Sequence, residues 1–548
     1  MDYKALADLL FPNVTMTPEQ LEEKYPARQN KGGAVITRMA PSPTGFVHLG
    51  NLVQGLTSER MAHQSDGVLF LRVEDTDAKR EVEGAVEMLI DGVGHYGINF
   101  DEGVTADGEI GQYGPYRQRK RRDIYHVYAK KLVLDGMAYP CFCTEQELEQ
   151  NHALQEQNKE NFGYYGKWAI WRDRPIEQIK QKLDAGEQWV LRFRSTGSIE
   201  NKIKFTDLIK GNLELTENDI DHVLLKSDGI PTYHFAHAVD DHLMRTTHVV
   251  RGDEWLSTLP FHIQLFRALG FKVPKYVHIG PLMKMDGNSK RKLSKRKDPE
   301  LALSYYKAEG FPVESVYEYL MTVLNSNFED WRRANPDLPP QDFKFSVKKM
   351  NPAGSLFDYM KLCDVSKNII SKFTAEKVSN LVIEWAKEFD EEYYNLLTAD
   401  KDYTVGIFSI DRGNKKPRKD IAKWDEVRAY TEYFFDSLFN PEYTYPEHIA
   451  VDDVKAVLNK YAEIYSADDD KDEWFAKVKS ICEPLGFSPD VKAYKAEPDK
   501  FKGHVGDVST IIRVAVTGRT NTPDLCAIMK LLGKDRVTAR LTDAINAI

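Results

Sequence analysis

A single histidine stands in a loop rich in proline and glycine, close to the start of the chain. The segment APSPTGFVHLGN, residues 40–51, places Pro41, Pro43, Gly45 and His48 between an apolar run and a predicted helix. Prolines disfavour helix in the residues before them, and glycine lets the backbone approach a ligand closely. The N–H groups of a helix N-terminus, with an imidazole beside them, suit phosphate oxygens. A histidine in a surface turn is the plainer interpretation of this segment when it is taken alone.

A basic loop in the second half of the chain strengthens the phosphate interpretation. KLSKR, residues 292–296, follows a predicted strand and offers Lys292, Lys295 and Arg296 to an anion. Cationic donors aimed at charge that develops in a transition state are among the largest contributions to catalysis. Two loops from two halves of one sheet therefore predict a nucleotide site more strongly than either loop does.

The elements around the first loop form a βαβ unit. Apolar runs in residues 34–39 and 67–75 predict strands. The spacing of Leu49, Leu52, Val53 and Leu56 predicts the helix between them, beginning near Gly50 and running to residue 64. Parallel strands joined through a helix form a right-handed crossover, and ligands bind beyond the carboxyl ends of such strands. The histidine loop and EDTD, residues 74–77, would lie at that edge.

The pattern of apolar and polar residues changes twice beyond this unit. Residues 119–225 are mixed and rich in aromatics, which is typical of an insertion, and the strand pattern resumes in residues 222–255. A helix is predicted through Ala268 and a strand over residues 276–281. From residue 298 the pattern is mainly helical.

The two ends of the chain are predicted to be helical. Residues 1–33 indicate a short helix followed by a polar linker. The last helix is predicted to have Thr522 as its N-cap and Pro523 as its first residue, with a break at Gly533.

Composition limits the class of protein. The 548 residues exceed one ordinary core, so two to four domains are expected, and 42% hydrophobic residues indicate a globular chain. No apolar run reaches the ~20 residues that a membrane span needs, and the first residues lack the basic flank of a signal peptide. We therefore expect a cytoplasmic protein without a membrane partner. Five scattered cysteines argue for free thiols rather than a disulfide framework.

Net charge argues against a uniformly basic surface. The formal charge is −10, so a polyanion would have to meet local basic segments, namely residues 117–122, 290–297 and 414–419. A run of charges is usually a solvated face, which is the preferred interpretation of each of these segments when it is taken alone.

Five ordered blocks, taken together, resemble one enzyme family. RMAPSPTGFVHLGN, LRVEDTD, SDGIPTYHFAHAVDDHLMRTTHVVRGDEW, KLSKR and RVAVTGRTNTPDL are similar to the bacterial glutamyl-tRNA synthetases, which are class I aminoacyl-tRNA synthetases. The resemblance implies an α/β multidomain fold: a Rossmann-like parallel-sheet catalytic domain with an inserted acceptor-binding domain, followed by a mainly α-helical region. The implied segments are an N-terminal extension (1–33), the two catalytic halves (34–118 and 226–284), the insertion (119–225), a stem-contact region with the KLSKR loop (285–375) and an anticodon-binding domain (376–548).

The resemblance also implies a reaction in two steps. L-glutamate attacks ATP, bound with Mg²⁺, to form glutamyl-adenylate, and the 2′-hydroxyl of the terminal tRNA adenosine then takes the glutamyl group. The implied partners are ATP, L-glutamate and tRNA(Glu), with tRNA(Gln) left open, and the implied state is a monomer. No covalent nucleophile is needed, because alignment of reactants alone removes ~7 to 11 kcal/mol of barrier.

Two family motifs define the expected nucleotide site. HLGN corresponds to the HIGH motif, with Asn51 where the motif has its last histidine, and KLSKR corresponds to KMSKS, with Lys295 at the lysine used on the ATP phosphates. The expected catalytic residues are His48, Gly50, Lys292 and Lys295. The expected ATP-binding residues are Thr44, Gly45, His48, Gly50, Asn51, Glu254, Trp255, Lys292, Ser294, Lys295 and Arg296.

A second set of residues matches the amino-acid pocket of the family. Arg38 and Arg251 match positions that recognise carboxylates, and a guanidinium holds a carboxylate with two hydrogen bonds. An amide would leave those donors unpaired, which disfavours glutamine. The expected glutamate-binding residues are Arg38, Ala40, Ser42, Glu74, Tyr233, His237 and Arg251. Taken alone, an arginine of this kind is more often in an ion pair, and a tyrosine is more often in the core.

CFCT resembles the start of a zinc site found in some members of the family. Tetrahedral zinc needs four ligands, and no cysteine follows Cys141 and Cys143 until Cys363. Tyr164, Tyr165 or His152 would have to complete the site. Two free thiols are the preferred interpretation, so zinc is not expected.

The resemblance to a tRNA synthetase implies that the basic segments contact tRNA phosphates. Phosphates attract lysine and arginine, and Trp424, Tyr430 and Phe434 could stack on unpaired anticodon bases. For any one of these aromatics, the core of a helical domain is the preferred interpretation.

Four other functions compete with the favoured one. Glutaminyl-tRNA synthetase typically has EPNG and IEDTN where this chain has SPTG and VEDTD, and the short enzyme that glutamylates a modified tRNA base lacks the long region after residue 376. A non-catalytic tRNA-binding relative would be expected to lack His48 or Lys295. A small-molecule nucleotidyltransferase would have no use for the helical tail.

Overall fold

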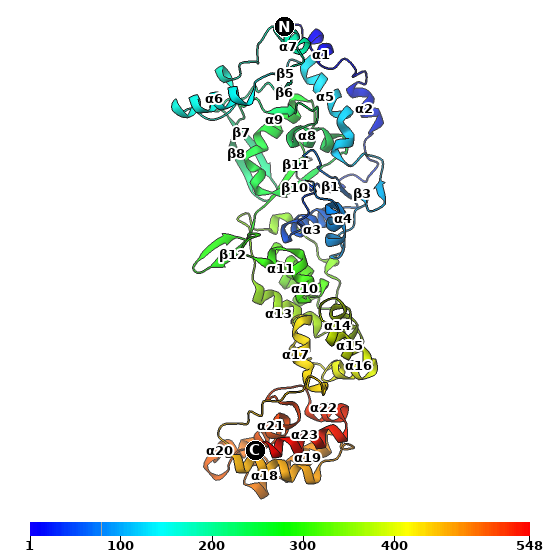
Figure 1. Cartoon of the computed structure of the whole chain (residues 1–548), viewed down its shortest axis with the longest axis vertical. Coiled ribbons are helices and arrows are strands. Elements are labelled where there is room, and N and C mark those ends of the chain that lie inside the picture. Colours follow the sequence, from blue (N-terminus) through cyan, green and yellow to red (C-terminus); the bar gives the residue numbers. More distant parts are fainter. Residues whose placement is uncertain (78, 80) are drawn as a thin grey trace. The chain divides into compact units, whose positions relative to one another are not determined.

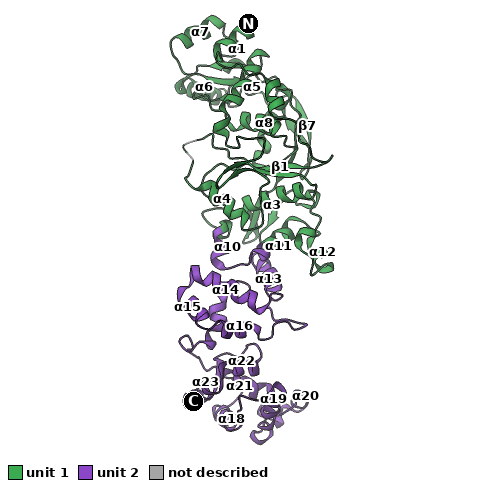
Figure 2. Ribbon diagram, turned by 90° about the vertical axis from the view of Figure 1, so that its right-hand side faces the viewer, with its two compact units in different colours: residues 1–303, 317–358 green, residues 304–316, 359–548 purple. Residues whose placement is uncertain are grey.

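The computed structural model describes residues 1–77, 79 and 81–548 and separates into two compact units. One unit comprises residues 1–303 and 317–358, and the other comprises residues 304–316 and 359–548 (Figure 2). Among the described residues, no helix has both the length and the apolar character that a bilayer crossing requires.

The first unit is built on a parallel sheet. Three strands pair in the order β1, β2, β3, and β10 pairs in parallel with β11; the N–H of Thr247, just before β10, donates to the carbonyl of Ile36 in β1 at 3.0 Å. A short antiparallel strand, β4, pairs with β3. The strands are β1 (Ile36–Met39), β2 (Val68–Leu71), β3 (Glu102–Thr105), β4 (Gly108–Ile110), β10 (His248–Gly252) and β11 (Lys275–Ile279).

Helices cover both faces of this sheet. In both views, α8 (Tyr233–Leu243) lies on one side of β1, while α3 (Leu49–His63) and α4 (Ala85–Gly94) lie on the other (Figures 1 and 2). All four residues of β1 are buried, as expected for a parallel strand covered twice. The predicted βαβ unit is confirmed, and its helix begins at Leu49, next to the expected start near Gly50, with His48 as its cap. The helix predicted through Ala268 is α9 (Leu259–Ala268), and the strand predicted near residues 276–281 is β11.

His63, in the last turn of α3, joins this helix to the start of β3. Its Nδ1 lies 2.9 Å from Glu59 Oε1, and its Nε2 lies 3.0 Å from Asp101 Oδ2. The hydrogen bond to Glu59, helped by the one to Asp101, raises the pKa of His63 to about 9, against the burial that lowers it. The imidazolium is therefore the charged form near neutral pH.

We expect His63→Gln to destabilise the protein in a pH-dependent way. Because the pKa is raised on folding, the stabilisation is complete below the unfolded pKa of about 6.5 and is lost as the pH rises through about 9. The variant should therefore lower the thermal midpoint of the first unit more at about pH 6 than at about pH 10. Scanning calorimetry at both pH values measures the difference, with the exposed His152→Gln as control. An equal loss at both pH values would contradict the ion-pair role.

The insertion between the two halves of the sheet carries its own small sheets. β5, β6 and β9 are antiparallel, and β7 and β8 form a hairpin. The elements are α5 (Arg122–Leu134), β5 (Ala138–Cys141), α6 (Glu145–Gln157), α7 (Ile176–Asp184), β6 (Val190–Phe193), β7 (Lys202–Asp207), β8 (Gly211–Thr216) and β9 (Val223–Leu225). The strand pattern expected over residues 222–255 proves to be two strands, β9 and β10, around α8.

The N-terminal extension packs on the insertion. It forms two short helices, α1 (Tyr3–Leu10) and α2 (Pro18–Lys24), where one was predicted. Lys130 on α5 donates to the carbonyls of Phe11 at 3.3 Å and Val14 at 3.2 Å. Arg28, which follows α2, pairs with Glu102 at 2.7 Å and so connects the extension to β3.

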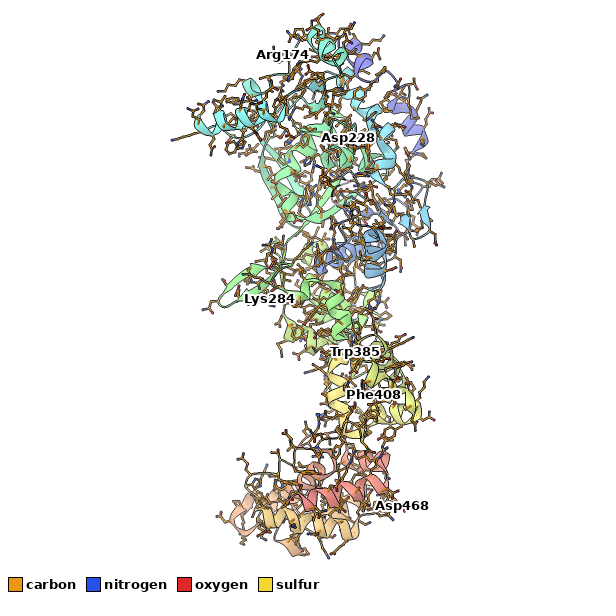
Figure 3. The ribbon with its side chains drawn as sticks, viewed as in Figure 1. Arg174, Asp228, Lys284, Trp385, Phe408 and Asp468 are labelled. Atoms are coloured by element: carbon orange, nitrogen blue, oxygen red, sulfur yellow. The ribbon has the colours of Figure 1, made fainter. Side chains whose placement is uncertain are left out.

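A hairpin precedes the KLSKR loop. It consists of β12 (Leu282–Asp286) and β13 (Ser289–Lys292), and β14 (Ser355–Leu356) pairs in parallel with β12. Lys284 on β12, labelled in Figure 3, pairs with Glu300 and so ties the hairpin to the chain after the loop. Two helices follow, α11 (Val313–Leu324) and α12 (Phe328–Ala334).

The regular elements of the second unit, among the described residues, are helices joined by loops. Its extended hydrophobic core includes Phe408, and Trp385 packs against it; both residues are labelled in Figure 3. Trp424 and Phe434 are buried in this core, so the preferred core interpretation is confirmed for both, and neither ring is free to stack on bases. Tyr430 is only partly buried. The helices are α10 (Leu303–Glu309), α13 (Tyr359–Ile370), α14 (Ala375–Phe389), α15 (Glu391–Ala399), α16 (Lys401–Ser409), α17 (Val427–Thr431), α18 (Val451–Ile464), α19 (Lys471–Ser480), α20 (Val491–Ala496), α21 (Val505–Thr517), α22 (Leu525–Leu532) and α23 (Lys534–Asn546).

The prediction that Thr522 is the N-cap of the helix ending at Gly533, which is α22, is wrong by two residues. Asp524 caps α22, because its Oδ1 accepts from the N–H of Ala527 at 2.9 Å, whereas the Thr522 hydroxyl donates to the carbonyl of Pro523 at 3.0 Å. An aspartate three residues before a free N–H outcompetes the threonine. The break at Gly533, which has a φ of 82°, is confirmed.

Candidate active site

The imidazole of His48 is fixed by the start of α3. Its Nδ1 accepts from the N–H of Asn51 at 3.2 Å, while the Asn51 Oδ1 accepts from the N–H of His48 at 3.0 Å, which is a reciprocal capping box. Because Nδ1 acts as acceptor, a neutral ring carries its proton on Nε2. Burial, assisted by Lys295 and Lys292, lowers the pKa of His48, against the effect of Glu254. The ring is therefore a neutral donor at its outer nitrogen.

Gly50 leaves the space that this ring occupies. A Cβ at position 50 would lie 2.9 Å from both Cε1 and Nδ1 of His48, closer than real contacts allow. The sequence singled out Gly50 by its motif, and the structure supplies a steric reason for the glycine.

We expect Gly50→Ala to separate helix stability from activity. Alanine gains up to about 1 kcal/mol in helix preference over glycine, but Gly50 lies in the first turn of α3 and displacement of the His48 ring removes the N-cap, so the two effects should offset each other and the thermal midpoint should change little. The His48 ring must rotate away from the new methyl group, and a misplaced catalytic group costs about 10- to 100-fold in rate. Gly94→Ala, at a helical glycine with nothing within 4 Å of its Cβ position, is the matched control. Equal adenylate formation by both variants would contradict this account.

The KLSKR loop lies opposite His48 across one cavity. His48, Lys292 and Lys295 line the same space of about 390 Å³. Its remaining lining comes from α3, from the end of β10 and from the turn after β11, including Gly50, Asn51, Glu254 and Leu293. The Lys295 Nζ also lies 3.9 Å from the centre of the Phe46 ring. Lys295 and residues 41–48 line a second cavity of about 190 Å³. The two motif loops, more than 240 residues apart in the chain, thus face each other.

A buried aspartate that the sequence analysis missed holds the basic loop in shape. Asp298 accepts from both Nη atoms of Arg291 at 2.6 and 2.7 Å and from the N–H of Ser294 at 2.8 Å. The Arg291 guanidinium, chiefly, holds the pKa of Asp298 well below its usual range. The loop is therefore anchored at both ends, and Lys295 and Arg296 extend from it exposed to solvent.

Ionic side chains beneath the other strand ends form a buried network. Asp241 on α8 accepts from Arg38 Nε at 3.0 Å and from Arg72 Nη1 at 2.7 Å, and Arg72 Nη2 donates to Glu74 Oε1 at 3.0 Å. Arg38 and Arg72, together with the contact to His237, keep the pKa of Asp241 well below its usual value despite burial. Burial raises the pKa of Glu74, and Arg72 and Arg38 oppose that rise.

The neighbouring Asp240 extends this network into the insertion. It accepts from Arg121 Nε at 2.6 Å, from Gln118 Nε2 at 2.9 Å and from the Tyr125 hydroxyl at 2.8 Å. Arg121 is buried, so the prediction that the whole basic segment 117–122 faces phosphates is wrong for this residue. Arg119, Lys120 and Arg122 of the same segment are exposed.

Arg251, at the end of β10, differs from these arginines because its partners carry no charge. Its Nε donates to His278 Nε2 at 3.0 Å. The remaining contacts are His262 Nδ1 at 3.1 Å, the Tyr233 hydroxyl at 3.4 Å, the Trp255 carbonyl at 3.4 Å and the Tyr276 ring at 4.6 Å. Within the described residues, no carboxylate lies within 4 Å of this guanidinium, and only 3% of the residue is exposed. It is a buried positive charge that a substrate carboxylate would complement.

The other residues expected at the site lie around these groups. Tyr233 stacks parallel to His237, with ring centres 5.7 Å apart, and its ring centre lies 4.4 Å from that of Trp255. His237 is fully buried, with Nδ1 2.6 Å from Asp241, so it lies behind Tyr233. In the histidine loop, Ala40 is half-buried, the Ser42 carbonyl accepts from the N–H of Thr44 at 2.8 Å, and Gly45 has a φ of 77°.

The two thiols of CFCT do not assemble a metal site. The Tyr164 hydroxyl contacts Cys141 Sγ at 3.5 Å and Cys143 Sγ at 3.4 Å. His152 stacks instead on Phe162, with ring centres 3.9 Å apart. No third His, Cys, Asp or Glu in the described part of the chain joins these thiols, so the residues present do not fit tetrahedral zinc.

Comparisons with known proteins agree with this architecture. Residues 34–328 match the family model described as "tRNA synthetases class I (E and Q), catalytic domain", and residues 418–545 match the model described as "Anticodon binding domain". The sheet with its two facing loops, followed by a helical unit, is thus that of a class I tRNA synthetase.

Full-length relatives define the branch more narrowly. A glutamate–tRNA ligase of Acetivibrio thermocellus is 50% identical, over 99% of each chain, and one of Clostridium perfringens (strain 13) is 48% identical, over 99% of this chain and all of that one. The solved structure of a glutamate–tRNA synthetase from Elizabethkingia anophelis has 26% identity and a TM-score of 0.73, and the match covers 94% of this chain and all of that one. The chain belongs to the glutamate–tRNA ligase family.

Proposed function

We propose that this chain joins L-glutamate to tRNA(Glu) in two steps, in a cytoplasmic monomer. A carboxylate oxygen of glutamate attacks the α-phosphorus of ATP, pyrophosphate leaves, and the 2′-hydroxyl of the terminal adenosine then attacks the acyl carbon and releases AMP. Mg²⁺ enters as the ion bound to ATP. The observation that supports this most is the single cavity lined by His48, Lys292 and Lys295 at the carboxyl edge of the sheet.

In this proposal the nucleotide residues act by position and charge. His48 donates from Nε2 to a phosphate oxygen, and Lys292 and Lys295 neutralise the pyrophosphate as it forms. Gly50 and Asn51 hold the His48 ring in place. The further residues proposed to contact ATP are Thr44, Gly45, Glu254, Trp255, Ser294 and Arg296.

The glutamate site is proposed at the ends of β1, β2 and β10. Arg251 binds the side-chain carboxylate, Glu74 receives the α-ammonium, and Tyr233 contributes its hydroxyl. The other residues proposed for this pocket are Arg38, Ala40, Ser42 and His237. For Arg38 the Asp241 pairing means that it acts mainly by shaping the pocket.

The tRNA is proposed to contact three segments. The insertion, residues 119–225, receives the acceptor end, residues 285–375 contact the stem, and residues 376–548 read the anticodon. Exposed Arg119, Lys120 and Arg122 support the first of these assignments, since phosphate neutralisation releases counterions.

Charging assays with labelled glutamate test the proposal. Purified tRNA(Glu) and tRNA(Gln) should be supplied separately, and ATP–pyrophosphate exchange should be measured with and without tRNA. We expect glutamate to be attached to tRNA(Glu) and exchange to depend on tRNA. Glutamine attached in place of glutamate, or exchange without tRNA, would overturn the assignment; charging of tRNA(Gln) with glutamate would widen it.

A further inference from the structure

Arg251 is buried without a carboxylate partner among the described residues. The other buried arginines nearby each have one. Arg38, Arg72 and Arg121 are equally buried, yet each lies within 3.0 Å of an aspartate oxygen. A buried ion normally requires a partner of opposite charge, because desolvation costs several kcal/mol. At Arg251 two imidazoles take the positions that carboxylates take around the other three.

His278 presents a lone pair to Arg251 because its other nitrogen is engaged. Its Nδ1 lies 2.7 Å from Asp207 Oδ2, and Asp207 also accepts from the N–H groups of Ile209 at 2.9 Å and Lys210 at 2.8 Å. The Nδ1 proton therefore points to Asp207, and Nε2 accepts from Arg251. The imidazole ring of His278 therefore separates the Arg251 guanidinium from the Asp207 carboxylate.

His262 is arranged in the opposite tautomer with the same result. Its Nδ1 accepts from Arg251, so its proton is on Nε2, which lies 2.8 Å from His234 Nδ1. Burial lowers the pKa of His262 well below its usual value, and Arg251 adds to that effect. Burial likewise lowers the pKa of His278, against the opposing hydrogen bond to Asp207. Both rings are thus neutral acceptors near neutral pH.

We propose that His262 and His278 are positioning residues that fix the orientation of Arg251 while leaving its positive charge for the substrate, and that they thereby set the preference for a carboxylate over an amide side chain. A carboxylate at either position would orient the guanidinium equally well but would neutralise it. The buried charge would then favour an uncharged amide as much as an acid. This inference rests on the proposed role of Arg251 in binding the glutamate side chain.

Paired substitutions separate charge from shape. In His262→Asn the amide oxygen replaces Nδ1 as a neutral acceptor, and His262→Asp places a carboxylate at the same point. His278→Gln and His278→Glu form the equivalent pair for Nε2. KM and kcat for glutamate, and activation of glutamine, are measured by tRNA-dependent pyrophosphate exchange. His248→Asp, which adds a negative charge at the start of the same strand, is the control.

The expected result is a difference within each pair. The neutral variants should keep KM for glutamate within about 3-fold, whereas the acidic ones should raise it about 30-fold or more and reduce the preference for glutamate over glutamine about 100-fold, with kcat changed less than KM. Equal effects of the neutral and acidic members would overturn the proposal, because they would indicate packing alone. If one acidic variant fails to fold, the other pair still decides. Failure of the unsubstituted enzyme to activate glutamate would count against the proposed function instead.

Discussion

Lys295→Ala should slow the formation of glutamyl-adenylate by about 100- to 1,000-fold, the loss typical when one preorganised donor to developing charge is removed. The ammonium group lines the cavity that also contains His48, and its loop is held by the contacts of Asp298 with Arg291 and Ser294. Because these contacts do not involve the Lys295 side chain, the substitution should remove the charge without changing the conformation of the loop. Pre-steady-state pyrophosphate release, with saturating tRNA and glutamate, measures this step directly.

Lys297→Ala is the control for this substitution. It removes the same charge two residues further along the loop, at an exposed position. We expect its adenylate formation to stay within about 3-fold of the unsubstituted enzyme, because Lys295 lines the cavity that contains His48 and Lys297 does not. Adenylate synthesis unaffected by Lys295→Ala would exclude the proposed nucleotide site.

His48→Asn should abolish most activity and leave stability nearly unchanged. Asparagine is among the best N-cap residues, so its side-chain oxygen can replace Nδ1 as acceptor for the N–H of Asn51. It has no donor at the position of Nε2. We expect adenylate formation to fall about 100-fold, with a thermal midpoint close to that of the unsubstituted protein.

His48→Ala completes this comparison. It removes the cap as well as the donor, so it should show the same loss of rate together with a loss of about 1 kcal/mol in stability. Calorimetry and pyrophosphate release on both variants separate the two roles. An active His48→Asn enzyme would show that the histidine serves only to begin α3.

The sequence predicts those parts of the fold that depend on local pattern. The apolar runs around the histidine loop and the helical spacing after it correspond to β1, α3 and β2. The N-cap of α22 was misplaced because Thr522 and Asp524 are both good capping residues, and only the backbone path decides between them. Trp424 and Tyr430 look alike in the sequence, yet the first is in the core and the second lies at its edge.

The ionic contacts of the site could not be predicted in this way. Arg38 meets Asp241, and Arg251 meets His278, only after the chain has folded. The adjacent acids Asp240 and Asp241, in a helix made otherwise of apolar residues, a tyrosine and histidines, could have indicated this network, because buried carboxylates require cations nearby. Nothing in the local sequence distinguishes an arginine with an acidic partner from one with imidazole partners.

The network around Asp240 and Asp241 also has a consequence for biosynthesis. Arg38, Arg72 and Arg121 leave the ribosome long before the two acids that neutralise them in the finished protein. The nascent amino-terminal half must therefore keep these cations in water, and its central strands cannot close until α8 has emerged. Protease resistance of ribosome-bound chains should accordingly appear abruptly, once the exit tunnel has released that helix.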